Sequence, residues 1–373
     1  GPRIRVGYVS PDFRMHSVSY FTCPLLAHHD RQQFEIFCYS DVQKEDRVSR
    51  DIQDMVDHWI PAWDMSDAEL ARRINDDGID ILVDMAGHTG QNRLLAFARK
   101  PAPIQVSWLG YPNTTGLEAM DYRITDSIAD PEGEEEFHSE ELVRLPHGFL
   151  CYQPDPETPE VGPLTCEQNG YVTFGSFNNL AKMHAGVIEL WAAILRYVPN
   201  SRLILKSIFM DDPKTAERIL GQFADQGIAS SRLDILSRFP SKYDHFDTYN
   251  RMDIALDPFP YNGTTTTFEA LWMGVPVITL KGERHAGRVG ASILEHLGLD
   301  RLVAGSEKEY IQLAQNLASS PKIMAQFRDG MRESLASSLF MNGKEFSQKM
   351  ENFYHWAWNR HNALTSCDNI VIG

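Results

Sequence analysis

Four consecutive threonines, Thr264–Thr267, follow a short apolar strand (253–257) and a turn rich in proline and glycine. An apolar pattern of helical period then begins at Phe268. The threonines are therefore expected at a helix start, where unpaired N–H groups and the helix dipole attract phosphate. Glu269, one turn further, is a candidate acceptor for ribose hydroxyl groups. The candidate phosphate contacts are Gly263, Thr264, Thr265 and Thr266. A threonine-capped surface helix is the alternative.

Three other loops in the same half of the chain follow predicted strands and carry basic or amide groups. Asn179 and Lys182 come after strand 171–176, and Lys182 could neutralise charge on a leaving diphosphate. The remaining candidates are Lys242 and His245 at the start of a helix and Arg288 in a basic, glycine-containing loop. Singly, each could be a solvated surface residue or a helix cap. Together they predict a local basic site in an acidic protein.

Strands and helices alternate along the first 120 residues. The predicted strands are 4–10, 34–40, 79–85 and 104–109, and the predicted helices are 16–28, 46–57, 67–75 and 93–99. Alternation with short loops predicts a parallel sheet covered by helices, with ligands beyond the carboxyl ends of its strands. The loop 110–120, which contains Asn113-Thr114-Thr115, lies at such an end.

The segment 156–170 lies in the most proline-rich and acidic stretch of the chain, which predicts a linker. The alternation of strands and helices resumes after it. We therefore predict an α/β protein of two doubly wound, Rossmann-like domains facing a cleft, with C-terminal helices. The predicted boundaries are a first domain 1–155, expected to hold an acceptor, the linker 156–170, a second domain 171–340, expected to hold a nucleotide diphosphate, and a helix and tail 341–373.

Two pairs of acidic and histidine residues stand where strands of the first domain end. Asp12 and His16 follow the first strand, and Asp84 and His88 flank the end of another. Each could act as a general base toward an acceptor hydroxyl or orient a substrate. Each could equally be a structural residue with satisfied hydrogen bonds. The residues alone do not identify the general base.

Composition excludes several classes of protein. A formal charge of −16 argues against nucleic acid or anionic membranes as partners, and no apolar run is long enough to cross a bilayer. Five dispersed cysteines without metal-ligand spacing predict a reduced, cytoplasmic protein and no metal site. No dinucleotide-binding, P-loop or serine-hydrolase motif occurs. The initial Gly-Pro is expected to be a cleavage scar, with upstream sequence missing.

Several long motifs resemble the catalytic region of the SPINDLY and O-GlcNAc transferase family. They include VGYVSPDFRMHSVSYF, DILVDMAGHTG, RKPAPIQVSWLGYPNTTGLEAMDYRITDSIADP, VTFGSFNNLAKM and DPFPYNGTTTTFEALWMGVPVITLKG. The resemblance covers nearly the whole chain. It implies an inverting, metal-independent glycosyltransferase of GT-B architecture that needs no cofactor and modifies Ser or Thr of proteins. It also implies tetratricopeptide repeats upstream and a cytoplasmic or nucleocytoplasmic location.

The resemblance also implies roles for individual residues. Lys182 of FNNLAK resembles the essential lysine facing the diphosphate, and His16 of DFRMHSV the histidine near the sugar. The positions that resemble nucleotide contacts are Asn179, Lys242, His245, Thr265, Thr266 and Glu269. The four-threonine run departs from the Gly-His-Thr-Thr of O-GlcNAc transferases and is more similar to SPINDLY.

The donor expected from this likeness is GDP-fucose, with UDP-GlcNAc as the alternative. Two readings from other classes remain: a catalytically inactive nucleotide-sugar-binding module, and a glycosyltransferase acting on small molecules. A single displacement is expected, in which Lys182 and the helix start at 264–266 stabilise the departing diphosphate.

Overall fold

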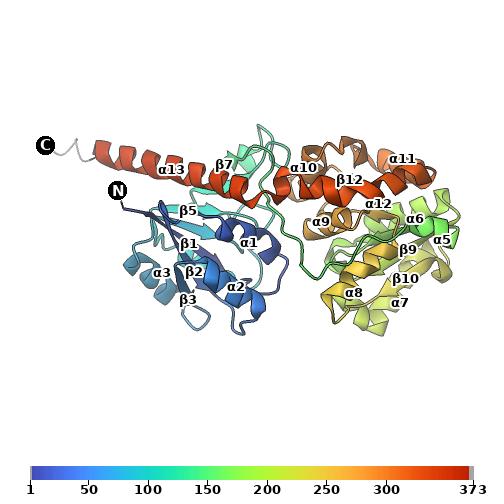
Figure 1. The fold of residues 1–373 in the computed structure, drawn as a ribbon, viewed down its shortest axis with the longest axis horizontal. Coiled ribbons are helices and arrows are strands. Elements are labelled where there is room, and N and C mark those ends of the chain that lie inside the picture. Colours follow the sequence, from blue (N-terminus) through green and yellow to red (C-terminus); the bar gives the residue numbers. More distant parts are fainter. Residues whose placement is uncertain (1, 369–373) are drawn as a thin grey trace. The chain divides into compact units, whose positions relative to one another are not determined.

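The computed structural model describes residues 2–368 and divides the chain into two compact units (Figure 1). Unit 1 comprises Gly1–Gln153 and Leu339–Gly373, and unit 2 comprises Pro154–Ser338. Each unit contains one parallel sheet with helices packed on it. The predicted α/β class is therefore confirmed, and each unit is described on its own below.

The unit 1 sheet has seven strands in the order β3-β2-β1-β4-β5-β6-β7. Its first strand is a run of buried β-branched and aromatic residues, which the sequence predicts with the same bounds. The order reverses between β1 and β4, where ligand sites of such sheets occur. The strands are β1 Ile4–Ser10, β2 Phe34–Ser40, β3 His58–Pro61, β4 Ile81–Asp84, β5 Ile104–Ser107, β6 Tyr122–Thr125 and β7 Glu141–Arg144.

Side-chain caps fix the helix starts of unit 1. Asp46 and Ser49 form a capping box on α2, and Ser66 and Glu69 form one on α3. Each box pairs backbone N–H groups that the helix itself leaves unpaired, so it sets where the helix begins. The helices are α1 Ser19–Ala27, α2 Arg47–Met55, α3 Asp67–Asp76, α4 Leu94–Phe97 and α13 Gly343–Asp368.

Helix α13, which belongs to the segment 341–373 predicted as a C-terminal helix and tail, packs on unit 1. The Tyr354 hydroxyl lies 3.0 Å from that of Tyr8 on β1, and Glu351 Oε1 lies 2.9 Å from His29 Nδ1. All four side chains are buried. Buried polar groups that satisfy one another in this way tie the C-terminal helix to the first sheet.

The unit 2 sheet has six strands in the order β10-β9-β8-β11-β12-β13. The strands are β8 Val172–Ser176, β9 Ser201–Lys206, β10 Leu233–Leu236, β11 Ile254–Leu256, β12 Val277–Leu280 and β13 Val303–Ala304. The helices are α5 Thr165–Asn169, α6 Ala185–Tyr197, α7 Pro213–Asp225, α8 Lys242–Asp247, α9 Thr265–Trp272, α10 Val289–His296, α11 Glu307–Ala318 and α12 Pro321–Ala336. The order reverses between β8 and β11, which marks the expected ligand edge.

The stretch predicted as a linker, 156–170, belongs to unit 2 and contains helix α5. The Gly162 amide donates to Asn250 Oδ1 at 2.7 Å, and the Cys166 amide donates to Asp253 Oδ1 at 2.9 Å. These hydrogen bonds fix the segment to the domain that follows it. The segment is therefore part of the second compact unit rather than a stretch between two units.

Three further observations concern the described part of the chain. No helix there is both long and apolar enough to cross a membrane. No group of three or more His, Cys, Asp or Glu side chains is arranged to hold a metal ion within residues 2–368. Cys23, Cys38, Cys151 and Cys166 are free thiols, and Cys367 lies outside the residues whose side chains are described.

Candidate active site

Lys182 lies at the carboxyl edge of the unit 2 sheet, in a short 3-10 helix after β8. Its ammonium donates to the carbonyl oxygen of Asn262 at 2.8 Å and lies 3.9 Å from the centre of the Tyr261 ring. Burial lowers the pKa of Lys182 to about 8, while the carboxyl group of Asp257 acts in the opposite direction. Lys182 is therefore a poorly solvated cation, which suits an anionic ligand such as a diphosphate.

Helix α9 begins at Thr265 with Thr264 at the N-cap position, as the sequence predicts. The Thr266 hydroxyl donates to Asn178 Oδ1 at 3.1 Å, which ties the helix start to the loop after β8. The Gly263 amide donates to Asp257 Oδ1 at 2.7 Å. The first turn of a helix leaves its N–H groups without intrahelical partners, so this start presents donors to an anion.

Glu269 is only 4% exposed and is held by two side chains. Its Oε2 accepts from His245 Nε2 at 3.0 Å and from the Tyr249 hydroxyl at 2.8 Å. Although burial alone would raise the pKa of Glu269, His245 and Tyr249 hold it below the usual range. Glu269 is thus an ionised carboxylate with one oxygen engaged by the protein. A ribose contact, as predicted, would use its Oε1.

The other predicted nucleotide contacts lie on neighbouring loops of unit 2. Asn179 Oδ1 caps the 3-10 helix by accepting from the Ala181 amide at 2.9 Å, and the residue is exposed. Lys242 is the first residue of α8, and its charge helps to lower the pKa of Glu269. Arg288 stands at the N-cap of α10 and donates from Nε to the carbonyl of Gly282 at 3.0 Å.

A direct hydrogen bond joins the Arg288 loop to the threonine turn. The Asn262 amide donates to the carbonyl of Ala286 at 2.8 Å, and Asn262 Oδ1 accepts from the Gly290 amide at 3.1 Å. Since Lys182 binds the carbonyl of this same Asn262, three loops of unit 2 meet around one residue. Three of the four loops predicted to meet at this sheet edge, those of Lys182, the threonines and Arg288, are thus joined by hydrogen bonds.

In unit 1, Asp12 and His16 form a pair directly after β1. Asp12 Oδ1 lies 3.6 Å from His16 Nε2 and 3.4 Å from an Arg14 guanidinium nitrogen. His16 Nδ1 accepts from the Val18 amide at 3.2 Å, which leaves the ring proton on Nε2, facing Asp12. This arrangement orients the imidazole as a base–carboxylate pair does. The base remains a prediction.

Asp84 and His88 have different surroundings from the Asp12–His16 pair. Asp84 is 1% exposed, and its two oxygens accept from the amides of Ala86 at 3.1 Å and Gly87 at 2.9 Å. Burial raises the pKa of Asp84 to about 6 despite these bonds. The geometry favours a structural role in the turn for Asp84. His88 is exposed, and its Nε2 lies 2.8 Å from the carbonyl of Thr115.

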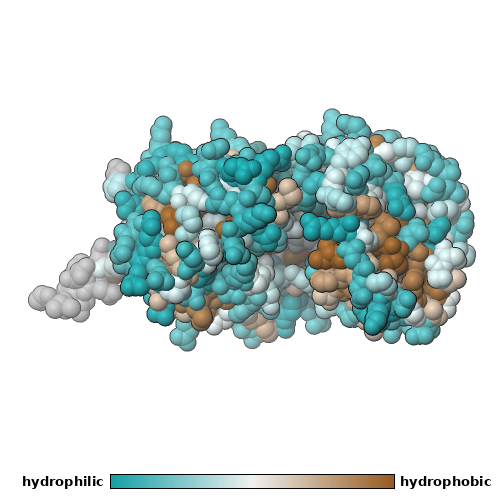
Figure 2. Space-filling model, turned by 90° about the horizontal axis from the view of Figure 1, so that it is seen from below, coloured by the Kyte–Doolittle hydropathy of each residue, from teal (hydrophilic) through white to brown (hydrophobic). Residues whose placement is uncertain are grey.

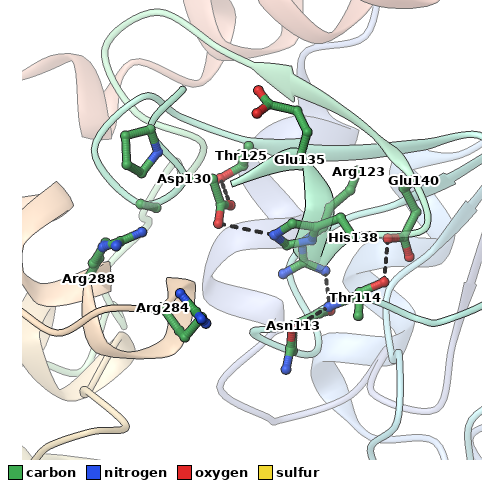
Figure 3. A network of polar contacts seen from close by, with 12 residues as sticks. Asn113, Thr114, Arg123, Thr125, Asp130, Glu135, His138, Glu140, Arg284 and Arg288 are labelled. Atoms are coloured by element: carbon green, nitrogen blue, oxygen red, sulfur yellow. Dashed lines mark hydrogen bonds and ion pairs between the residues drawn. The ribbon is translucent and has the colours of Figure 1, made fainter. Parts of the chain in front are cut away.

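A buried polar network holds the loop that His88 contacts (Figure 3). The Arg123 guanidinium on β6 donates to the carbonyls of Asn113 at 2.6 Å and Tyr111 at 3.0 Å. Glu140 accepts from the Thr114 hydroxyl at 2.6 Å and from the Thr115 amide at 2.6 Å. Asp130 accepts from Thr125 and lies 3.4 Å from His138. The contacts of Arg123 and Glu140 fix the loop 111–115, and with it the carbonyl of Thr115 that lies beside His88.

We expect Glu140→Gln to destabilise unit 1 by about 1.5–3 kcal/mol at pH 7, the range for hydrogen bonds to a charged group. Burial alone would raise the pKa of Glu140, but Thr114 and Thr115 hold it below the usual range. A lowered pKa gives stability that is present above the unfolded-state pKa and is lost as pH falls through the folded-state pKa. Urea unfolding of both proteins should therefore show a gap that shrinks toward pH 3–4.

Glu136→Gln is the matched control for this prediction, because Glu136 is an exposed carboxylate in the same segment. Its unfolding midpoint should equal that of the wild type at both pH values. An equal loss of stability in the two variants, or a gap for Glu140→Gln that does not depend on pH, would contradict the role given to Glu140.

The model of glycosyl transferase family 41 matches residues 1–154 and 167–350, which is most of the chain. The chain belongs to glycosyltransferase family 41. Its two Rossmann-like units have the GT-B fold, as the sequence resemblance implies.

Individual members of family 41 are similar to nearly the full length of this chain. The probable UDP-N-acetylglucosamine–peptide N-acetylglucosaminyltransferase SPINDLY of Arabidopsis thaliana is 45% identical over 96% of the chain and 40% of its own length. The corresponding Arabidopsis protein named SEC is 34% identical over 96% of the chain and 37% of its own length. The chain thus spans about two fifths of the curated relatives it matches.

A solved structure from the family has the same fold. A mutant O-GlcNAc transferase of Thermobaculum terrenum is 40% identical to this chain and superposes with a TM-score of 0.93, covering 97% of this chain and 69% of that one. The similarity includes both units. It confirms the predicted family and fold, while the role of each site residue stays a prediction.

Several residues of the candidate site were not predicted from the sequence. Asn178, Asp257 and Asn262 are buried and hold the threonine turn through hydrogen bonds to Thr266, Gly263 and Gly290. Lys206, the last residue of β9, contacts His245. The signal that could have identified Lys206 is its position, since a lysine that ends a parallel strand lies at the ligand edge.

Proposed function

We propose that this chain is the catalytic part of a protein O-glycosyltransferase that uses a nucleotide-sugar donor and modifies Ser or Thr of proteins. The observation that carries the proposal is the cluster at the carboxyl edge of unit 2, where Lys182, the start of α9 and Glu269 lie on joined loops. Family membership supports the reaction class. Upstream tetratricopeptide repeats and a cytoplasmic location belong to the same proposal.

The proposed reaction is a single displacement with inversion that needs no metal. The acceptor hydroxyl oxygen forms a bond to the anomeric carbon while the bond from that carbon to the diphosphate oxygen breaks. Lys182 and the N–H groups at Thr264–Thr266 stabilise the charge on the leaving diphosphate. The acceptor proton passes to a base of unit 1, for which His16 beside Asp12 is the first candidate, or to the leaving phosphate.

Within this class we propose GDP-fucose as the donor. The four-threonine run resembles SPINDLY, and the identity to the SPINDLY protein of Arabidopsis exceeds that to SEC. UDP-GlcNAc is the second candidate, because the names of both relatives specify UDP-N-acetylglucosamine. An inactive nucleotide-sugar-binding module is the third, and it would bind nucleotide without transferring sugar.

Thermal unfolding with GDP or UDP tests the donor. At 100 times its dissociation constant, a ligand of the native state adds about 2.7 kcal/mol of stability. We expect GDP to raise the melting temperature and UDP to leave it unchanged. Stabilisation by UDP alone would replace fucose with GlcNAc in the proposal. Stabilisation by neither nucleotide would overturn the assignment of unit 2 as the donor site.

A further inference from the structure

Lys206 is a buried cation that the proposed reaction does not use. The residue is 9% exposed, and its Nζ lies 2.5 Å from Nδ1 of His245. The ring centres of Phe177 and Phe239 lie 5.3 and 5.6 Å from the same nitrogen. Within the described part of the chain, Lys206 forms no ion pair with a carboxylate, and its neighbour His245 pairs with Glu269 instead. Burying a charge without an ionic partner costs free energy, so a lysine at this position indicates a functional role.

The hydrogen bonds around Lys206 fix the state of the neighbouring imidazole. An ammonium group can only donate, so His245 Nδ1 accepts from Lys206. The ring proton then sits on Nε2 and is donated to Glu269 Oε2 at 3.0 Å. A neutral imidazole thus connects a cation to an anion. One of the three N–H bonds of Lys206 is used by His245, and two remain beside aromatic rings.

The position of Lys206 relates it to the donor. Strand β9 is two places from β11 in the sheet, so Lys206 lies about 10 Å across the sheet from the strand leading to the threonine turn. Glu269, in the α9 helix that starts at this turn, is connected to Lys206 through His245. A nucleotide whose diphosphate binds at the threonine turn and whose ribose meets Glu269 extends its base toward β9.

The surroundings of Lys206 also suit a planar base. Unit 2 carries hydrophobic surface on one face (Figure 2). After β9, Ile208 and Phe209 are 56% and 50% exposed, and Tyr243 on α8 is 53% exposed. Burial lowers the pKa of Lys206 to about 8, with Lys242 acting in the same direction and Glu269 against it. The ammonium therefore stays charged at pH 7 although it is largely buried.

We propose that Lys206 is a specificity-determining residue of the donor site, where its ammonium donates a hydrogen bond to the exocyclic carbonyl oxygen of the nucleobase. This oxygen is O6 of guanine or O4 of uracil. The inference rests on the proposed nucleotide-sugar site of unit 2. Because a lysine cannot accept a hydrogen bond, an amino group at the same place, as in adenine or cytosine, leaves two donors facing each other. We therefore expect the site to prefer nucleobases with a keto group at this position.

Calorimetric titration of Lys206→Met with four ligands tests this role. The first ligand is the keto nucleotide that the wild type binds, GDP or UDP. The second is its analogue without the carbonyl in question, which is 2-aminopurine nucleoside diphosphate for GDP and CDP for UDP. The other two are ADP and inorganic pyrophosphate. The wild type should favour the keto nucleotide over the analogue by about 10- to 100-fold, the loss expected for one charge-assisted hydrogen bond. In Lys206→Met this preference should disappear, while pyrophosphate affinity stays within about twofold.

Two further variants of unit 2 complete the test. Lys206→Gln keeps a polar side chain that can both donate and accept, so it should bind the keto nucleotide and its analogue equally well, even if the Met variant folds poorly. Lys214→Met removes one exposed lysine of α7 and should leave all four affinities unchanged.

Three outcomes would overturn the inference. Base preference that persists in Lys206→Met and Lys206→Gln excludes base reading by this residue. An equal loss of nucleotide and pyrophosphate affinity shows a general electrostatic or structural role instead. A wild-type protein that binds pyrophosphate but no nucleoside diphosphate removes the proposed donor site itself, and that result is distinguishable because it appears before any variant is compared.

Discussion

Replacement of Lys182 with alanine is expected to lower turnover by about 10²- to 10³-fold, the cost of removing one preorganised electrostatic donor. In the proposed displacement the diphosphate gains negative charge as its bond to the anomeric carbon breaks. Lys182 is a poorly solvated ammonium held by the carbonyl of Asn262, so its charge is already in place. Steady-state kinetics with the identified donor measure the loss, which should fall mainly on kcat because the charge develops in the transition state.

Two controls separate this effect from damage to the fold. Lys281→Ala removes a more exposed lysine after β12, paired with Glu295, and should keep turnover within about twofold. Lys182→Ala should melt no lower than the wild type, because the group it removes is a partly buried cation without a carboxylate at ion-pair distance in the described structure. Near-normal turnover of a well-folded Lys182→Ala protein would contradict the assignment.

The sequence predicted the strands that are long and buried on both faces. Strands β1 and β2 have the predicted bounds because each is rich in β-branched and aromatic residues and contains only one charged residue, Arg5 or Glu35. Strand β6 was missed, since it has four residues and contains Arg123, a residue expected at the surface. Arg123 is 2% exposed because its guanidinium binds the carbonyls of loop 111–115. This cause of the burial of Arg123 can be recognised only when the position of loop 111–115 is known.

The candidate site residues were predicted from their positions after strands, and their hydrogen-bond partners were not predicted. The rule that loops after parallel strands meet at one edge correctly brought Lys182 and the α9 threonines to one cluster. The same rule could not show that Asp84 is engaged by two backbone amides or that Glu269 is held by His245. Those bonds depend on side-chain directions, which strand and helix periodicity do not specify.

Gly263→Ala is expected to lower stability by about 1–3 kcal/mol, the range typical of overpacking, and to weaken binding of the donor nucleotide. A Cβ at position 263 would lie 2.3 Å from Thr266 Oγ1 and 2.9 Å from Asn178 Oδ1. Both atoms belong to the hydrogen bond that ties the α9 start to the loop after β8. The added methyl group must therefore push these segments apart, and the N–H groups for the diphosphate move with them.

Gly221→Ala is the matched control, because it makes the same chemical change in helix α7, where no atom lies within 4 Å of the new Cβ. It should leave nucleotide affinity unchanged and raise stability by about 0.5–1 kcal/mol, the helix preference of alanine over glycine.

Titration with pyrophosphate distinguishes the diphosphate site from the nucleoside site. Because Gly263→Ala acts on the diphosphate site, it should weaken binding of pyrophosphate as much as binding of the whole nucleotide. Weakened nucleotide binding with normal pyrophosphate binding would instead place the diphosphate away from the threonine turn, and the mechanism proposed for Lys182 and α9 would fail with it.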